Sequence, residues 1–354
     1  MKRMMVLLVG ALMMSWVNAQ TIQENEMAIL YYSPKTTVVF QIQYTEEHYE
    51  KGLYSAYAEE LLGISDAIKE NQTHYAIEGA KIQTLTEADY SRPHKVTADP
   101  SIPTQLLSVN EKNLLVGYNI PYIAPKNNPH KPTVSNELKI ESKPIMPYQE
   151  EFLDAKSRAD EAQLIAKQIF RIRETRMYLL SGEVEHAPAD GQAMKLVLAE
   201  LERQEKQLVG LFTGQKTIQN GTKTIEICPT GKENVVKQIL YFSKENGFTD
   251  AENIDAEAVK IGLVVNRPQM LPAPVAQQKG KKKEASSEPS SIVYNIPGSA
   301  EATIDYRGER LCARTIPIAQ LGVDMPLAKD LFLGEKLPTI VFSEKTGNVV
   351  SISK

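Results

Sequence analysis

Residues 148–214 read YQEEFLDAKSRADEAQLIAKQIFRIRETRMYLLSGEVEHAPADGQAMKLVLAELERQEKQLVGLFTG, and this stretch decides the architecture. From Glu150 to Ser181 it has no proline or glycine and consists mainly of good helix formers. Pro147 precedes this run and Gly182 follows it, as at the two ends of a helix. Apolar residues recur at the spacing of one helical face, namely Phe152, Ala155, Ala159, Ala162, Ile165 or Ala166, Ile169 and Ile172. The pattern predicts a long helix.

A second helix is predicted from Gln192 to Phe212, and residues 182–191 between the two have the glycine, proline and aspartate content of a turn. Its apolar stripe consists of Met194, Leu198, Leu201, Leu208 and Phe212. The two stripes predict an antiparallel helical hairpin over residues 148–214. At a rise of about 1.5 Å per residue its first helix would be roughly 45 Å long. Two alternatives stay open: the hairpin packs along a β domain, or it projects as a coiled-coil arm with a partner at its tip.

Four side chains at the tip of the hairpin are the candidates for binding, namely Glu183, Glu185, His186 and Asp190. As a metal site they are weak candidates, because the loop has no calcium-binding register and one histidine among carboxylates is too few for zinc. A solvated turn is the favoured interpretation, and no metal or cofactor is predicted. The same four residues are the candidate contacts for a protein partner.

The first 19 residues have the pattern of a secretory signal peptide. Residues 1–3 are positive, residues 4–17 are apolar, and residues 17–19 form a small-residue cleavage site. We therefore expect an exported protein, in the periplasm or associated with the outer membrane. Removal of the signal leaves 38 basic against 44 acidic residues, a formal charge of −6, which does not favour nucleic acid as a partner. No later segment has the roughly 20 apolar residues that span a bilayer.

Residues 20–120 are predicted to form a mostly β domain with one short helix near residues 54–62. Alternating apolar residues predict strands at 27–32, 36–44, 74–77, 80–85 and 113–118. The first two would be joined by a turn at Ser33-Pro34-Lys35, and the next two by a turn at Glu78-Gly79. Prolines recur through residues 121–147, which predicts an extended connection into the helical hairpin.

Residues 215–354 are predicted to form a C-terminal β-sandwich. Its strands are expected at 223–228, 235–243, 258–265, 292–294, 302–306, 311–318, 339–342 and 349–352. Residues 271–291 are rich in lysine, serine and proline, and we expect them to be disordered within this sandwich. Cys228 and Cys312 fall in strand-like segments, where either a disulfide or two separate buried thiols is possible.

No catalytic motif is present in the sequence, so the catalytic residues, if any, are unknown. The histidines stand singly at positions 48, 74, 94, 130 and 186, and there is no His-Glu-x-x-His, Gly-x-Ser-x-Gly or phosphate-binding loop. Tyrosines crowd the N-terminal domain, which suggests a sugar or protein surface as an alternative to half-buried core positions. These tyrosines are Tyr31, Tyr32, Tyr44, Tyr49, Tyr54 and Tyr57.

Three groups of residues together resemble a known family. They are 31–36 (YYSPKT) with 57–63 (YAEELLG); 179–183 (LLSGE) and 188–191 (PADG) with 211–214 (LFTG); and 294–297 (YNIP) with 319–322 (AQLG). This combination is similar to the domain of unknown function 4831 family, described as secreted envelope proteins of Gram-negative anaerobes. The resemblance covers nearly the whole chain after the signal. It implies location and architecture, and it supplies no catalytic residues.

The expected fold class is α+β, with an N-terminal mostly β domain, a central antiparallel helical hairpin and a C-terminal β-sandwich. The leading functional hypothesis is a non-catalytic scaffold or protein-interaction module that contacts another envelope protein. The alternative is a periplasmic or surface glycan-binding protein or glycan hydrolase, suggested by the tyrosines and the abundant acidic residues.

Overall fold

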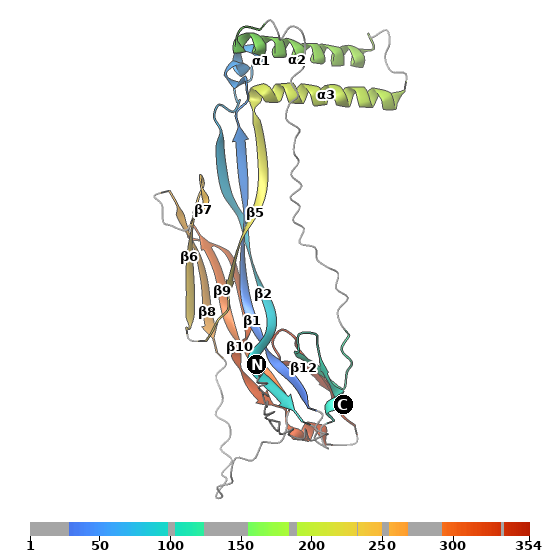
Figure 1. The fold of residues 1–354 in the computed structure, drawn as a ribbon, viewed down its shortest axis with the longest axis vertical. Coiled ribbons are helices and arrows are strands. Elements are labelled where there is room, and N and C mark those ends of the chain that lie inside the picture. The colour runs from blue at the N-terminus through green and yellow to red at the C-terminus, as the bar shows by residue number, and fades with distance from the viewer. Residues whose placement is uncertain are drawn as a thin grey trace, which may run out of the picture.

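The structure is a computed structural model that describes residues 28–97, 103–123, 155–183, 190–231, 233–249, 255–267, 292–333 and 336–354. This part of the chain is a mixed fold of helices and antiparallel sheets, drawn out along one axis (Figure 1). The predicted signal peptide, most of the proline-rich connection and the tract 271–291 lie outside the described residues.

A long three-stranded sheet, which we call the ribbon, runs through most of the molecule. Its strands are β2 (Gln72–Val96), β1 (Ile29–Glu50) and β5 (Gln215–Ile227), in that order and all antiparallel. Because β1 is central, Phe40 lies opposite Ile82 in one neighbour and Ile225 in the other. The upper part of the ribbon stands clear of the other sheets and carries the helices at its end (Figure 1).

The turns predicted at Ser33-Pro34-Lys35 and at Glu78-Gly79 are wrong, because β1 and β2 each continue through them. At both sites the register between the two strands shifts. At the first, beside Pro34, Ser33 of β1 and residues 89–92 of β2 have no partner across the ladder, and such an interruption tolerates a residue without an N–H. At the second, Glu78 has no partner across the ladder. In sequence, a bulge with proline or glycine looks like a turn.

A second sheet lies beside the lower part of the ribbon. It contains β10 (Glu309–Pro326), β9 (Val293–Tyr306), β8 (Glu257–Asn266), β6 (Val235–Ser243) and β7 (Gly247–Thr249), in that order. The strands predicted at 292–294 and 302–306 are one strand, β9, and β10 extends well beyond the predicted 311–318. The long β9–β10 pairing accommodates a shift in register between Ile318 and Val323.

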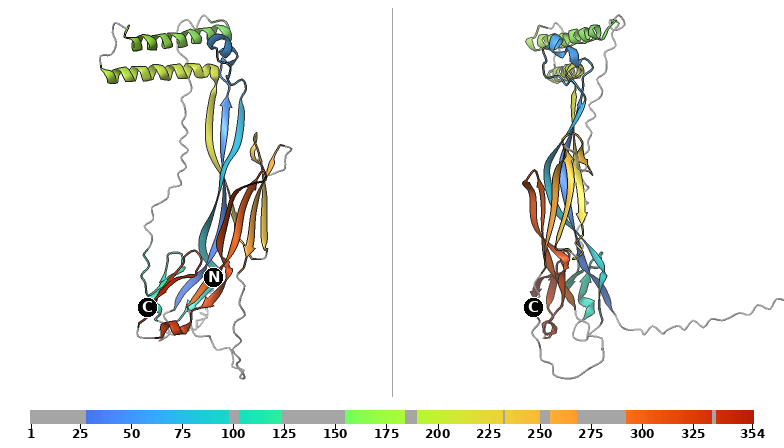
Figure 2. Two further views of the ribbon diagram at one scale, coloured as in Figure 1. Left: turned by 180° about the vertical axis from the view of Figure 1, so that it is seen from behind. Right: turned by 90° about the vertical axis from the view of Figure 1, so that its left-hand side faces the viewer.

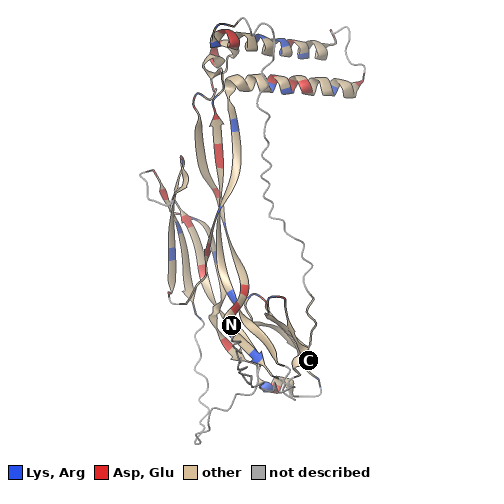
Figure 3. Ribbon diagram, viewed as in Figure 1, with Lys and Arg blue, Asp and Glu red and all other residues tan. Residues whose placement is uncertain are grey.

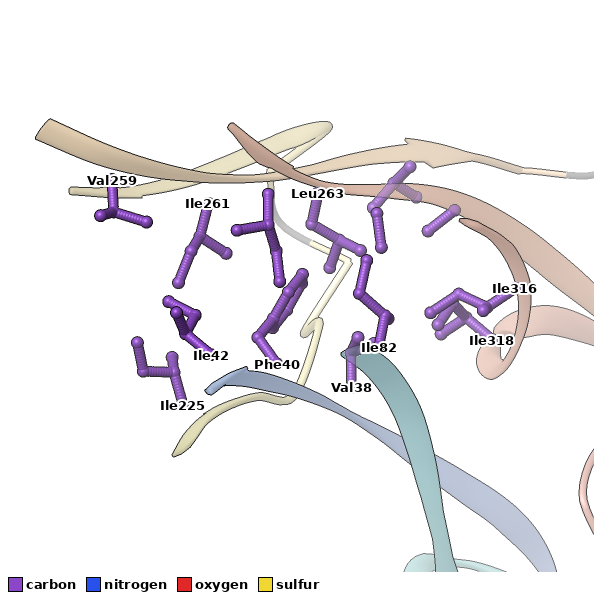
Figure 4. Packing of buried hydrophobic residues seen from close by; sticks show 14 of the residues in the cluster. Val38, Phe40, Ile42, Ile82, Ile225, Val259, Ile261, Leu263, Ile316 and Ile318 are labelled. Carbon is purple, nitrogen blue, oxygen red and sulfur yellow. The ribbon is translucent and has the colours of Figure 1, made fainter. Parts of the chain in front are cut away.

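The main core lies between the ribbon and the second sheet, which face each other (Figure 4). Alternate residues of a strand point to the same side, so each sheet contributes every second side chain to this layer. The buried residues at its centre are Val38, Phe40, Ile42, Ile82, Ile225, Val259, Ile261, Leu263, Ala302, Ile304, Ile316 and Ile318. The alternate apolar side chains that the sequence pattern predicts for β1 are therefore the ones that fill the core.

One side chain of the second sheet completes the edge of β1 where β5 ends. Gln320 lies in the irregular part of β10, accepts a hydrogen bond from the Thr36 N–H at 2.8 Å and donates one to the Thr36 carbonyl at 2.8 Å. The amide thus pairs with the backbone of β1 as a neighbouring strand would. Two residues further on, Gly322 lies close against β9, where a Cβ would be 2.2 Å from the Ile296 carbonyl oxygen.

A third, smaller sheet forms the lower end of the molecule. It contains β12 (Val349–Ser353), β11 (Thr339–Phe342), β4 (Leu115–Tyr118) and β3 (Leu107–Val109), in that order. The 3-10 turns η2 (Thr104–Leu106) and η4 (Lys329–Phe332) flank it. A second core joins this sheet to the lower end of the ribbon, and its buried residues include Tyr31, Val96, Leu115, Tyr118, Phe332, Ile340 and Phe342.

The sheets join segments from both sides of the helical hairpin. β5 pairs with β1, and β11 pairs with β4. The residues expected as an N-terminal domain (20–120) and those expected as a C-terminal sandwich (215–354) therefore share the ribbon and the third sheet.

The described helices gather at the free end of the ribbon. They are α1 (Ala58–Leu62), which follows the 3-10 turn η1 (Ser55–Tyr57), α2 (Arg158–Ser181) and α3 (Gly191–Thr213). The expected start near residue 150 is wrong, because residues 155–157 are not helical and Ser157 caps α2 by accepting the Asp160 N–H at 3.2 Å. No helix among these is both long and apolar enough to cross a membrane.

Phe40→Ala should lower the free energy of unfolding by about 3–5 kcal/mol, because it leaves a cavity where the ribbon faces the second sheet. Chemical denaturation followed by circular dichroism measures the change. The matched control is Gln43→Ala, an exposed position of the same strand, where the change should stay within about 0.5 kcal/mol. Equal losses in the two variants would contradict the face-to-face core.

Candidate functional site

The helices α2 and α3 form an antiparallel pair, which we call the arm, and it projects sideways from the free end of the ribbon (Figures 1 and 2). The structure shows that the hairpin projects and does not pack along a β domain, while a coiled coil and a partner at its tip stay predictions. The joint is made by close backbone contact. A Cβ on Gly52 would lie 2.6 Å from the Leu211 carbonyl oxygen, and one on Gly214 would lie 2.4 Å from that of Glu50. The Tyr54 N–H donates to the Leu211 carbonyl at 2.8 Å, which ties the joint to α3.

The base of the arm has its own apolar core. The segment η1–α1 covers it, with Tyr54 and Ala58 fully buried against both long helices. The Tyr54 hydroxyl donates to Glu161 at 3.2 Å, and burial together with this carboxylate raises the pKa of Tyr54 to about 12. The arm contributes Ala162, Ile165, Ala166, Ile169 and Ile172 from α2, and Leu208, Leu211 and Phe212 from α3.

The distal half of the arm is different, because its large apolar side chains face solvent. On α2, Phe170 is 49 % exposed, Met177 58 % and Leu180 68 %, and on α3 Leu196 is 73 % exposed. Positions 170, 173, 177 and 180 are spaced by three and four residues, so they share one face of α2. We call Phe170, Arg173, Met177 and Leu180 the distal stripe. A single exposed apolar residue is ordinary, whereas a row of them on one helix face is less common.

Two arginines and one glutamate connect the helices in the middle of the arm. Arg173 Nε lies 2.6 Å from Glu205 Oε1, and Arg176 Nη1 lies 2.8 Å from Glu205 Oε2. The Arg173 guanidinium also lies over the Phe170 ring, 5.8 Å from its centroid. Two positive groups therefore share one carboxylate, and both arginine side chains remain more than a third exposed.

Two of the four tip residues lie within the described part of the chain, and both take part in helix ends. Asp190 caps α3, because its Oδ1 accepts the Gln192 N–H at 3.2 Å. The Glu183 N–H donates to the Tyr178 carbonyl at 3.2 Å, beyond the left-handed Gly182 that ends α2. Glu185 and His186 lie outside the described residues. Within the described ranges no three His, Cys, Asp or Glu side chains gather as a metal site.

A polar cluster that the sequence did not suggest joins the lower end of the ribbon to β10. Ser33 Oγ lies 2.7 Å from His94 Nε2 and donates to Asp324 Oδ1 at 3.3 Å. Arg92 binds the same carboxylate, with its Nε 3.2 Å from Asp324 Oδ2 and its Nη2 on Oδ1. We call Ser33, Arg92, His94 and Asp324 the polar lock. Ser33 is the unpaired residue of β1 at the first register shift.

The polar lock has the residue types of a hydrolase triad but a different geometry. In a triad the aspartate holds the histidine nitrogen remote from the serine. Here Asp324 Oδ2 lies 3.8 Å from the same His94 Nε2 that faces Ser33. Serine, histidine and carboxylate therefore converge on one point, and Asp324 does not hold the far nitrogen of the ring as a triad aspartate does.

The surroundings of the polar lock also favour a structural role. Ser33 is buried, and the cavity beside it has a volume of about 10 Å³, close to the space of one water molecule. Burial lowers the pKa of His94, the Asp324 carboxylate opposes this effect, and the Arg92 charge adds to it. A neutral His94 thus belongs to the folded state at neutral pH.

Several of the tyrosines that suggested a sugar surface are packed inside the protein. Tyr31 is buried, and its hydroxyl donates to the Val293 carbonyl and accepts the Val293 N–H, each at 2.8 Å. Tyr54 is buried in the arm base. Tyr44 stacks edge-on against Phe248 with ring centroids 5.5 Å apart. These contacts stabilise the junctions between sheets.

The two cysteines are separate in the structure. Cys228 and Cys312 are both free thiols, and both are half-buried. Cys228 Sγ accepts a hydrogen bond from the Gln320 side chain at 3.7 Å, beside the edge of β1.

The family model described as Domain of unknown function (DUF4831) matches residues 27–350. This chain belongs to that family. The match includes the ribbon, the arm and all the described sheets, so the architecture above is that of the family region. Neither the curated proteins nor the solved structures gave a match.

His94→Gln should make stability less sensitive to acid. Because the pKa of His94 is lowered in the folded state, the unfolded chain binds its proton first as the pH falls below about 6.5. Protonation of the unfolded chain therefore favours unfolding, and the folded protein loses stability until the pH reaches the lowered pKa of His94. Unfolding free energies at about pH 7.5 and about pH 5 should differ less in the variant than in the wild type. An equal difference in both proteins would contradict the neutral polar lock.

Glu205→Gln should loosen the distal arm, because Arg173 and Arg176 lose their shared carboxylate. Amide hydrogens of α2 beyond Arg173 should exchange about tenfold faster, as expected for the loss of a charged hydrogen bond. The matched control is Glu202→Gln on the same helix, an exposed glutamate with no ion pair among the described residues, and its exchange should match the wild type. Faster exchange in the control alone would contradict this role of Glu205.

Proposed function

We propose that this protein is a non-catalytic, exported envelope protein that works as a protein-interaction module, with the arm as its docking element. The observation that carries this proposal is the distal stripe. The arm is anchored by a buried core at its base, yet it exposes large apolar side chains on one face away from the rest of the protein. Such a surface costs free energy in water and is stabilised by a partner that covers it.

The architecture supports docking in a second way. The backbone contacts of Gly52 and Gly214 hold the arm at the end of the ribbon, so the distal stripe is displayed away from the second and third sheets. A surface that is presented on a fixed element loses little conformational entropy when it binds. Export and an envelope partner rest on the signal-peptide pattern of residues 1–19.

We also propose that the arm is a coiled-coil hairpin. Residues 162, 165, 169, 172, 176 and 179 of α2, and residues 194, 197, 201, 204, 208 and 211 of α3, are spaced by alternating steps of three and four. This is the heptad spacing of a coiled-coil seam. All these residues are apolar except Arg176 and Gln204. The two polar residues lie where no segment among the described residues covers the arm. The tip residues Glu183, Glu185, His186 and Asp190 extend the proposed docking surface.

A photo-crosslinking residue at Met177 should give a defined adduct with another envelope protein in intact cells. The matched control is the same residue at Thr175, an exposed position on the other side of α2, which should give little or no adduct. A further variant replaces residues 183–190 by a neutral linker and measures how much the tip contributes. If neither Met177 nor the tip yields an adduct, the arm is not a docking element and the proposal fails.

A further inference from the structure

We propose that two copies of the protein form a weak dimer, in which their β12 strands pair antiparallel across a two-fold axis at Ser351. This contact would join the third sheets of the two copies into one continuous sheet. It is independent of the proposed function, because β12 lies at the lower end of the molecule and the arm at the opposite end (Figure 1). Three properties of β12 lead to this inference: its free edge, its exposed apolar side chains and its symmetry.

β12 is an edge strand without the charged residues that usually protect an edge. Among the described residues it pairs with β11 only, and residues 350–353 are all exposed. Charged side chains on an edge strand discourage pairing with another chain. The other edge strands with at least five described residues are β2, β5 and β10, and each of them has several charges (Figure 3). β12 reads VVSIS, so no charge opposes a second strand at its free side.

The apolar side chains of β12 continue the core face of the third sheet to its edge. Ile352 lies opposite Ile340, which is fully buried in the second core, so the two side chains point to the same side of the sheet. Ile352 itself is 45 % exposed, and Val350 is 65 % exposed. A strand paired with the free edge of β12 would extend the sheet and cover both side chains.

The sequence of β12 is complementary to itself about Ser351. Opposite residues of an antiparallel pair point to the same face, so the two-fold axis must pass through a residue and not between two residues. An axis at Ser351 is the one that pairs all five residues of the strand. It places Val350 of each copy opposite Ile352 of the other, so the exposed apolar side chains meet on both sides of the axis. A patch that complements itself in this way fits a second copy in a two-fold dimer.

The size of the contact predicts weak binding. A contact of five residues on each copy is smaller than the roughly 1,200 Å² buried in stable interfaces. β12 is also short, and its register with β11 shifts at Val350, and both features limit pairing at an edge. We therefore expect a dissociation constant above about 1 μM. If the arm is a docking element, the dimer displays two arms and binds more tightly to a surface with several sites.

Cysteine crosslinking tests the position of the axis. Residue 351 alone meets its own copy, so Ser351→Cys should give a disulfide-linked dimer under mild oxidation, seen as a reducible band of twice the mass. The matched control is Ser353→Cys in the same strand. Its two Cα atoms would be roughly 14 Å apart, beyond the reach of a disulfide. The native Cys228 and Cys312 are common to both variants. Equal dimer yields in the two variants, or none in either, would overturn the inference.

A second pair of substitutions tests the apolar contact. Ile352→Lys places a charge opposite Val350 of the other copy, and the two-fold axis repeats the change, so the dissociation constant should rise about tenfold. Sedimentation velocity over a series of protein concentrations measures it. The matched control is Ile218→Lys, which changes an exposed isoleucine of the edge strand β5 and should leave the association unchanged. Circular dichroism checks that both variants keep the fold. A wild-type chain that stays monomeric throughout the series, or equal losses in both variants, would overturn the inference.

Discussion

The structure depends on the pairing of β1 with a strand on each side. This strand has 22 residues and is the centre of the ribbon, so its register with β2 and β5 decides which side chains face the main core. A slip of one residue would turn Phe40 and Ile42 toward solvent, because neighbouring side chains of a strand point to opposite faces. The same strand ends in the lower core at Tyr31 and leads to the joint of the arm at Gly52. An error in its register would therefore affect both ends of the molecule.

Polar contacts at the lower end of β1 hold this register. The Gln320 amide pairs with the Thr36 backbone, and the Tyr31 hydroxyl bonds both the N–H and the carbonyl of Val293. The polar lock at Ser33 adds a charged connection to β10. Each of these contacts provides hydrogen bonds to buried polar groups, and those bonds form only when the strands are in this register. Apolar packing alone tolerates small shifts. Ser33, His94 and Asp324 are thus explained by folding, although their composition resembles that of a catalytic triad.

Local patterns in the sequence predict the parts of the fold that depend on local structure. The end of α2 at Ser181, α3, β6 at 235–243 and β11 at 339–342 match the predicted bounds closely, because helical spacing and apolar alternation are read within a few residues. The continuity of β1 and β2 was missed because the register shifts at Pro34 and Glu78 involve residues that are typical of turns. The pairing of β1 with β5 joins residues far apart in sequence, and no local pattern shows it. The polar lock was missed for the same reason. The distal stripe was not predicted either, because the spacing of residues 170, 173, 177 and 180 says nothing about exposure, which comes from the structure.

The position of the distal stripe on the molecule argues that its exposure is functional. The chain has two cores between sheets and one in the arm base, and it also exposes single large apolar residues at several places on the sheets, such as Leu85, Ile218 and Val350. On α2, Met177 and Leu180 lie beyond the last core residue, Ile172, whereas Phe170 lies beside that core on the exposed side of the helix. A hairpin that ended near Ile172 would keep the whole buried core of α2 and expose none of Met177, Tyr178 and Leu180. The additional turns of helix therefore contribute little to the buried core of this chain, and the proposed docking function would give their apolar side chains a role.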